Sequence, residues 1–233
     1  MKHLLLLSNS TMKGQAYFEW PLPHVKEFCK THSIKRIAFV PYAAVGFSYD
    51  KYESMISKAM RLIGIEIVSI HREPDAIEEA DAIAVGGGNT FALLKKLYET
   101  GHYERIQRQV EFDSKPYMGW SAGANMACPA LCTSNDMPIV EPPSFRALGF
   151  ISQQINPHYT AKVIEGHGGE SRDLRLKEYL AANPASEVLC LPEGTLLRVE
   201  GDKMYFEGEG ELTRMRHEKD FEVLASGTDV NQH

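Results

Sequence analysis

Short apolar runs alternate with helical patterns along this chain, and this alternation constrains its fold more than any other feature. Five runs are rich in Leu, Ile, Val and Ala but too short for helices, so we predict buried strands at residues 4–7, 36–42, 66–70, 82–85 and 116–120. Strands that alternate with helices are typical of a doubly wound, mostly parallel sheet. The expected fold class is therefore α/β.

The segments between the strands carry the signals that begin and end helices. Asp50 is expected to cap a helix over residues 51–63. Asn89 is expected to cap a helix over residues 90–100, which Gly101 ends.

The last third of the chain departs from this alternation. Residues 188–194 are predicted to form another core strand, and apolar and polar residues then alternate around glycine-rich turns, as in β-hairpins. The sequence shows no linker or internal repeat. We therefore expect a single α/β domain over residues 1–233, with β-hairpins at its C-terminal end.

Composition and charge exclude several classes of protein. The formal net charge is -6 and Lys and Arg form no dense run, so no nucleic-acid partner is expected. The apolar run at residues 4–7 is too short for a secretory signal, and no run approaches the ~18 apolar residues that span a bilayer. The four cysteines are scattered, so we expect reduced thiols and no metal site. Together, these observations predict a cytoplasmic protein with no membrane partner.

Two glycine-rich segments, at residues 86–90 and 119–125, stand where a predicted strand passes into a helix. Ligands bind at such junctions in α/β folds. The second segment places Ser121 between Gly119 and Gly123, in the spacing of a nucleophile elbow. A serine that only caps the helix is the alternative, but the strand before it and the small residues after it favour a nucleophile.

The backbone amides of Gly88 and Ala122 are the expected donors of an oxyanion hole for this nucleophile. A dinucleotide site is a competing interpretation of the first segment. Phe91 stands where the third glycine of G-x-G-x-x-G belongs, which argues against it. A purely structural turn stays open as an alternative.

A serine at neutral pH needs a general base, and His158 is the leading candidate. It follows an apolar segment that ends in a proline, and a hydrogen-bonded core histidine is the alternative. His71 stays possible as a base, although its neighbours indicate an exposed loop. His167 lies in a glycine-rich stretch and is a candidate for lining the substrate site.

Two acids are candidates for orienting the imidazole of His158. Glu193 follows a predicted strand, and a strand end can hold a carboxylate rigidly, which favours it over Asp136. For Asp136, fixing a turn or binding a substrate amine are the alternatives.

Seven motifs, in order from residue 4 to residue 194, resemble those of the peptidase E family of aspartyl dipeptidases: LLLLSNST, VGGGNTFxLL, GWSAGAN, TSNDMPIV, QINPHYT, EGHGGESR and LPEG. The resemblance implies a flavodoxin-like, class I glutamine amidotransferase-like core. It also implies a serine peptidase that cleaves dipeptides with an N-terminal aspartate and uses no metal or organic cofactor.

The resemblance also implies roles for individual residues. Ser121 matches the nucleophile and His158 the base, and the acid maps to Glu193 or Asp136. The oxyanion donors match Gly88 and Ala122. Arg172 matches an arginine that binds the aspartyl carboxylate. Asn89 and His167 are further candidates for binding substrate.

Three other functions compete with this one. A cyanophycinase-like hydrolase would act on aspartate-containing polymers, and a glutamine amidotransferase would carry cysteine in place of Ser121. A non-catalytic α/β module would only bind a small molecule. The expected partner is an Asp-Xaa dipeptide, and the sequence leaves open whether the chain forms a homodimer.

Overall fold

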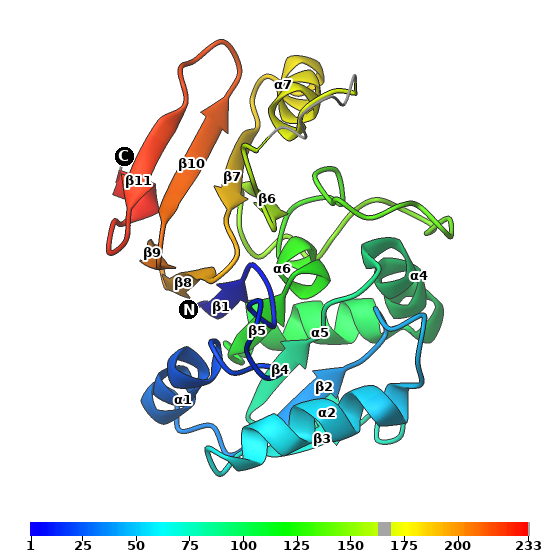
Figure 1. Cartoon of the computed structure of the whole chain (residues 1–233). Helices are drawn as coiled ribbons and strands as arrows, with labels where there is room; N and C mark the ends of the chain where they lie inside the picture. The colour runs from blue at the N-terminus through cyan, green and yellow to red at the C-terminus, as the bar shows by residue number, and fades with distance from the viewer. Residues whose placement is uncertain (163–168, 233) are drawn as a thin grey trace.

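The computed structural model describes residues 1–162 and 169–232. A seven-stranded sheet has the strand order β3-β2-β4-β5-β1-β8-β9 (Figure 1). Its first five strands along the chain pair with one another in parallel: β1 (His3–Leu7), β2 (Arg36–Val40), β3 (Glu66–Ser69), β4 (Ala82–Val85) and β5 (Tyr117–Trp120). These strands match the five predicted apolar runs, and the predicted doubly wound α/β fold is confirmed.

Helices cover both faces of this sheet, which explains why its central strands are apolar at nearly every position. On one face, alternate strand residues such as Leu5 and Phe39 pack against α1 (Leu22–Thr31) and α2 (Tyr49–Arg61). On the other face, residues such as Leu6 and Val85 pack against four helices: α3 (Ala76–Glu79), α4 (Thr90–Thr100), α5 (His102–Glu111) and α6 (Ala122–Met126).

One of the two predicted helix caps is correct. Asn89 caps α4, because its side chain accepts a hydrogen bond from the Ala92 amide, and Gly101 ends the helix with a φ of 69°. The prediction for Asp50 is wrong: α2 begins at Tyr49, two residues before the predicted start, and Ser48 accepts the hydrogen bond from the Lys51 amide. Asp50 lies in the first turn, where its carboxylate favours the positive end of the helix.

A second sheet of four strands has the order β11-β10-β7-β6. It contains β6 (Gln154–Pro157), β7 (Glu187–Leu191), β10 (Glu211–Arg216) and β11 (Glu222–Ala225). Leu176 and Leu180 of α7 (Arg172–Ala182) pack against this sheet. The expected C-terminal hairpins are present: β10–β11 extends the second sheet, whereas β8 (Thr195–Glu200) and β9 (Lys203–Gly208) extend the first. A short 3-10 helix, Val230–Gln232, lies near the end of the chain.

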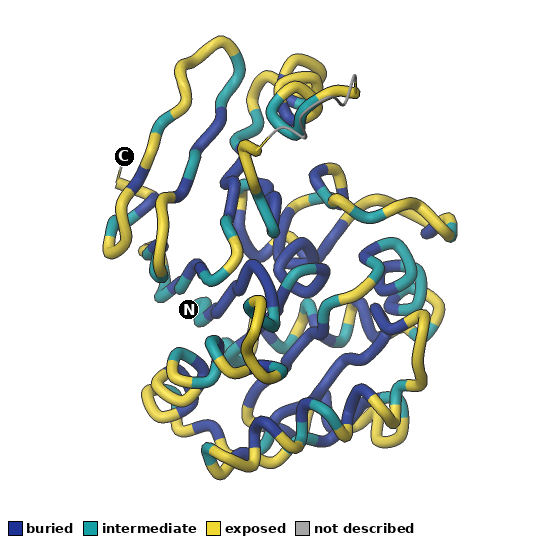
Figure 2. The backbone as a smooth tube through the Cα atoms, in the orientation of Figure 1, coloured by how far each residue is buried: buried dark blue, intermediate teal, exposed yellow. Residues whose placement is uncertain are grey.

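The chain crosses from one sheet to the other between β7 and β8, through residues 192–194. Proline at position 192 has no amide hydrogen, which agrees with β7 ending at Leu191 rather than at residue 194 as predicted. Figure 2 shows that the buried backbone follows the central strands, whereas residues 192–194 in the crossing region are half-buried or exposed. Within the described residues, no helix combines the length and apolar character needed to cross a bilayer.

Candidate active site

Ser121 occupies the turn between β5 and α6 in a conformation that few non-glycine residues adopt. Its φ is 53° and its ψ is -111°. Such strain persists only where surrounding contacts impose it. Here the Ser121 amide donates a hydrogen bond to the Leu7 carbonyl of the adjacent strand β1, at 3.0 Å.

The two glycines that flank Ser121 are required because the chain passes very close to itself there. A Cβ atom on Gly119 would lie 2.3 Å from the Gly123 carbonyl oxygen, and one on Gly123 would lie 2.1 Å from the Val85 oxygen. Real Cβ atoms do not approach this closely. The small-x-Ser-x-small spacing therefore follows from backbone packing, as the sequence reasoning supposed.

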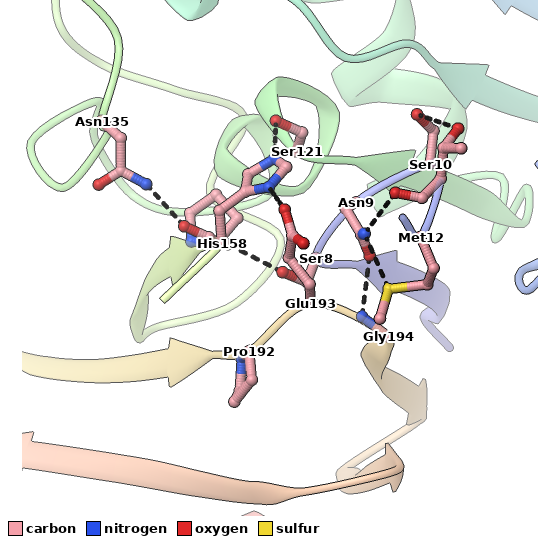
Figure 3. Close-up of polar contacts among 12 residues, drawn as sticks. Ser8, Asn9, Ser10, Met12, Ser121, Asn135, His158, Pro192, Glu193 and Gly194 are labelled. Atoms are coloured by element: carbon pink, nitrogen blue, oxygen red, sulfur yellow. Dashed lines mark hydrogen bonds and ion pairs between the residues drawn. The ribbon is translucent and has the colours of Figure 1, made fainter. Parts of the chain in front are cut away.

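His158 follows β6 and joins Ser121 to Glu193 (Figure 3). Its Nε2 atom lies 2.9 Å from the Ser121 Oγ atom, and its Nδ1 atom lies 2.7 Å from the Glu193 Oε1 atom. With the proton on Nδ1, the ring donates to Glu193 and accepts the hydroxyl of Ser121. This is the order of contacts in a serine–histidine–acid triad.

The three side chains come from strand ends in two different sheets. Ser121 follows β5 of the first sheet, whereas His158 and Glu193 follow the parallel neighbours β6 and β7 of the second. The side chain of His158 is 37% exposed and that of Glu193 is 50% exposed. The triad is therefore open to solvent on one side, where a substrate can reach it.

Asp136 lies outside this hydrogen-bonded chain. Its Oδ2 atom accepts hydrogen bonds from the amide of Thr90, at 2.8 Å, and from the hydroxyl of the same residue. Thr90 is the first residue of α4, where a carboxylate is favoured by the helix dipole. Asp136 therefore anchors the loop over residues 133–138 to the start of α4 and does not contact His158.

The side chain of Asn89, which was predicted to bind substrate, forms hydrogen bonds within the protein. Its Oδ1 atom caps α4 and its Nδ2 atom donates to the Met137 carbonyl at 2.9 Å. Both ends of the amide group are therefore engaged within the protein. Asn89 and Asp136 together attach the 133–138 loop to the glycine-rich turn after β4.

That glycine-rich turn lies directly against the nucleophile. A Cβ atom on Gly87 would lie 3.1 Å from the Ser121 Cβ atom, and Gly88 has a φ of 138° in which a Cβ would lie 2.2 Å from the Ala43 carbonyl oxygen. Among the described residues, neither the Gly88 amide nor the Ala122 amide has an acceptor. Both predicted oxyanion donors are thus available for a ligand beside Ser121.

A cavity of about 600 Å³ lies between the 133–138 loop and α7. Arg172, at the start of α7, lines this cavity and donates from Nη1 to the His158 carbonyl at 3.1 Å. Burial lowers the pKa of its guanidinium, which still remains charged at neutral pH. Asp136 lines the same cavity, so that groups of opposite charge face one space.

His167, predicted to line the substrate site, lies outside the described residues. Ser8 and Asn9, which sequence reasoning did not single out, contact the triad region through buried polar side chains. The available signal was their position, because they directly follow the buried strand β1 at the edge of the sheet where ligands bind.

Comparisons with known proteins identify relatives of this chain. The family model for peptidase family S51 matches residues 4–206. A protein named Peptidase E from Actinobacillus pleuropneumoniae is 48% identical over 206 residues, which cover 87% of this chain and 88% of that protein. A Peptidase E from Haemophilus influenzae is 47% identical over 216 residues, which cover 88% of this chain and 99% of that protein.

A solved structure shows that the fold is shared more widely. The crystal structure of a peptidase from an acI-B1 Actinobacterium matches with a TM-score of 0.73 at 17% identity, covering 99% of this chain and 96% of that one. The resemblance that the seven motifs indicated is confirmed by the family match and by the curated relatives. The chain belongs to peptidase family S51.

Proposed function

We propose that this protein is a serine dipeptidase that hydrolyses Asp-Xaa dipeptides through an acyl-enzyme on Ser121. Membership of a peptidase family makes the chain a hydrolase of peptide bonds, and its curated relatives carry the name Peptidase E. The observation that carries the proposal is the hydrogen-bonded series from the Ser121 hydroxyl through His158 to Glu193.

The geometry supports a two-step mechanism. Ser121 attacks the peptide carbonyl while His158 Nε2 takes its proton, and Glu193 stabilises the resulting imidazolium through Nδ1. The amides of Gly88 and Ala122 bind the oxyanion, where a single donor is worth ~10²–10³ in rate. His158 then protonates the departing amine, and water hydrolyses the aspartyl-enzyme by the same proton transfers.

The cavity lined by Arg172, which bonds to the His158 carbonyl, supports aspartate as the first residue of the substrate. An N-terminal aspartate carries a carboxylate and an ammonium group, and the cavity offers Arg172 and Asp136 to them. Arg172 donates one of its five N–H groups to the His158 carbonyl, so the others can bind a carboxylate in paired hydrogen bonds. The described residues provide no donor for Oδ1 of Asp136, which leaves this oxygen for an ammonium group.

A panel of four substrates tests this proposal: Asp-Leu, Asn-Leu, Glu-Leu and acetyl-Asp-Leu. We expect rapid hydrolysis of Asp-Leu alone. The Asn side chain lacks the negative charge that Arg172 binds, and the longer Glu side chain places its carboxylate at a different position. Acetylation removes the charge of the N-terminal ammonium group. A site built around such a bond rejects analogues that lack it by up to ~10⁴–10⁵.

The same panel separates the alternatives. Equal turnover of acetyl-Asp-Leu and Asp-Leu would contradict a dipeptidase and favour a cyanophycinase-like hydrolase. A folded protein that turns over none of the four substrates, and whose serine does not react with a fluorophosphonate, would favour a module that only binds small molecules.

A further inference from the structure

The residues at the end of strand β1 form hydrogen bonds to the segments that carry Ser121, His158 and Glu193. β1 lies between β5 and β8 in the first sheet, and its C-terminal end runs into Ser8 and Asn9. These two polar residues are 0% and 1% exposed. Buried polar groups need hydrogen-bond partners, and here the partners belong to the segments that carry the catalytic side chains.

Ser8 connects the first sheet to the second. Its Oγ atom accepts a hydrogen bond from the His158 amide at 2.8 Å and donates one to the Leu191 carbonyl at 2.9 Å. His158 and Leu191 stand at the C-terminal ends of the paired strands β6 and β7. One hydroxyl thus fixes the end of each strand relative to β1.

Asn9 holds the other side of the segment that carries Glu193. Its Oδ1 atom accepts from the Gly194 amide at 2.9 Å, and its Nδ2 atom donates to the Thr11 carbonyl at 3.0 Å. Gly194 has a φ of 77°, and a Cβ atom there would lie 3.2 Å from the Met12 side chain. Ser8 and Asn9 therefore bracket Glu193: Ser8 bonds to the Leu191 carbonyl, and Asn9 bonds to the Gly194 amide, as Figure 3 shows for Asn9.

The nucleophile is attached to the same strand, because the Leu7 carbonyl accepts the hydrogen bond of the Ser121 amide. We propose that Ser8 and Asn9 are positioning residues for catalysis: Ser8 sets His158, and Asn9 sets Glu193, relative to the strand that holds Ser121. This inference rests on the triad assigned under the proposed function.

The backbone of His158 shows why such positioning is needed. Its φ of 53° is strained, and its imidazole is 37% exposed, so packing does little to fix the ring. Hydrogen bonds hold the backbone instead. Ser8 accepts from its amide, Arg172 donates to its carbonyl, and Asn135 donates to the preceding carbonyl of Pro157 at 2.6 Å.

The test compares Ser8→Ala with Ser69→Ala in the full chain, with Asp-Leu as substrate. Ser69 is a matched control, because it is a buried serine at the end of β3 in the same sheet, and its hydroxyl contacts His71 Nδ1 at 2.6 Å and the Phe39 carbonyl at 3.4 Å. We expect Ser8→Ala to lower kcat by ~10²-fold with KM unchanged, as small misplacements of reacting groups do. Ser69→Ala should keep the wild-type kcat. Wild-type kcat in Ser8→Ala would overturn the proposal.

A double-mutant cycle separates positioning from a general loss of structure. If Ser8 acts through His158 and Glu193, adding Ser8→Ala to Glu193→Gln should lower kcat far less than it does in the wild type. Multiplicative losses would contradict the proposal. If Ser8→Ala does not fold, the same cycle with Asn9→Ala decides the question. An active Ser121→Ala variant would instead overturn the proposed function itself.

Discussion

At the residue scale, the site depends on two side chains held in strained backbone conformations. Ser121 and His158 both have a φ of 53°, although neither is glycine. Each such residue costs of order 1–3 kcal/mol and persists only where its surroundings impose it. At Ser121 the flanking glycines permit the turn, and at His158 hydrogen bonds fix the backbone on both sides. In these backbone conformations the two side chains contact each other.

The two candidate acids should affect different kinetic constants. Glu193 contacts the imidazole, so Glu193→Gln should lower kcat for Asp-Leu by ~10²-fold or more and leave KM nearly unchanged. Asp136 lines the substrate cavity, so Asp136→Asn should mainly raise KM. Steady-state kinetics on the two variants measures both effects. A loss of kcat in Asp136→Asn with full activity in Glu193→Gln would reverse the assignment.

Arg172 should determine the preference for aspartate. We expect Arg172→Met to lower kcat/KM for Asp-Leu by ~10²-fold or more and to abolish the preference for Asp-Leu over Asn-Leu. Arg175→Met is a matched control, because Arg175 lines the same cavity from the next turn of α7 but is exposed. Competition between the two dipeptides gives the ratio directly. An unchanged preference in Arg172→Met would show that another group binds the carboxylate.

At the scale of elements, the β5–α6 turn depends on close approach between backbones. A Cβ on Gly123 would clash with the Val85 carbonyl, so Gly123→Ala should destabilise the protein by more than about 3 kcal/mol. Gly46→Ala is the control, because a Cβ at Gly46 would meet nothing within 4 Å. That variant should unfold at or slightly above the wild-type Tm. Thermal unfolding of both variants would refute the packing argument if their midpoints were equal.

Local sequence signals predicted the elements of the first sheet well, because both the buried strands and the capping of α4 by Asn89 depend on residues close in sequence. The start of α2 was misplaced because Ser48 and Asp50 are both good capping residues and the backbone alone selects between them. The second sheet was not foreseen, since β6 and β7 pair across about thirty residues that include a helix.

In the site, too, features set by neighbouring residues were predicted, whereas contacts between distant segments were not. The glycine spacing around Ser121 followed from the sequence because the close contacts are made within one turn and its neighbouring strand. The choice between Glu193 and Asp136 could not be read from strand ends alone, since it depends on which loop faces His158 once two sheets have come together. The contacts of Ser8 were missed for the same reason.

At the scale of the whole molecule, the proposed active site lies at the junction of the two sheets. β1 and β5 supply one side, β6 and β7 supply the other, and residues 192–194 connect them (Figure 1). The cavity that the proposal assigns to aspartate lies between the 133–138 loop and α7, which packs on the second sheet. In the proposed mechanism, the first sheet therefore presents Ser121 as the nucleophile, and the second presents His158 as the base and Glu193 as the acid.

The same packing predicts how the four thiols react in the native protein. Cys29, Cys128 and Cys190 are buried, and burial raises the pKa of Cys29 and Cys128 to about 12. Cys132 is exposed at the cavity. We expect one thiol to react with a disulfide reagent in the native state and four after denaturation, with Cys132→Ser leaving none in the native state. Rapid reaction of more than one native thiol would contradict the buried placement.

The central claim is that Ser121 is the nucleophile, and covalent labelling tests it most directly. A fluorophosphonate should add one label per chain, located on Ser121 by peptide mass analysis, and should abolish hydrolysis of Asp-Leu in proportion to labelling. Ser121→Ala should take up no label and lose ~10⁴-fold or more in kcat. A label on another residue, or a Ser121→Ala variant that still hydrolyses Asp-Leu at the wild-type rate, would contradict the account.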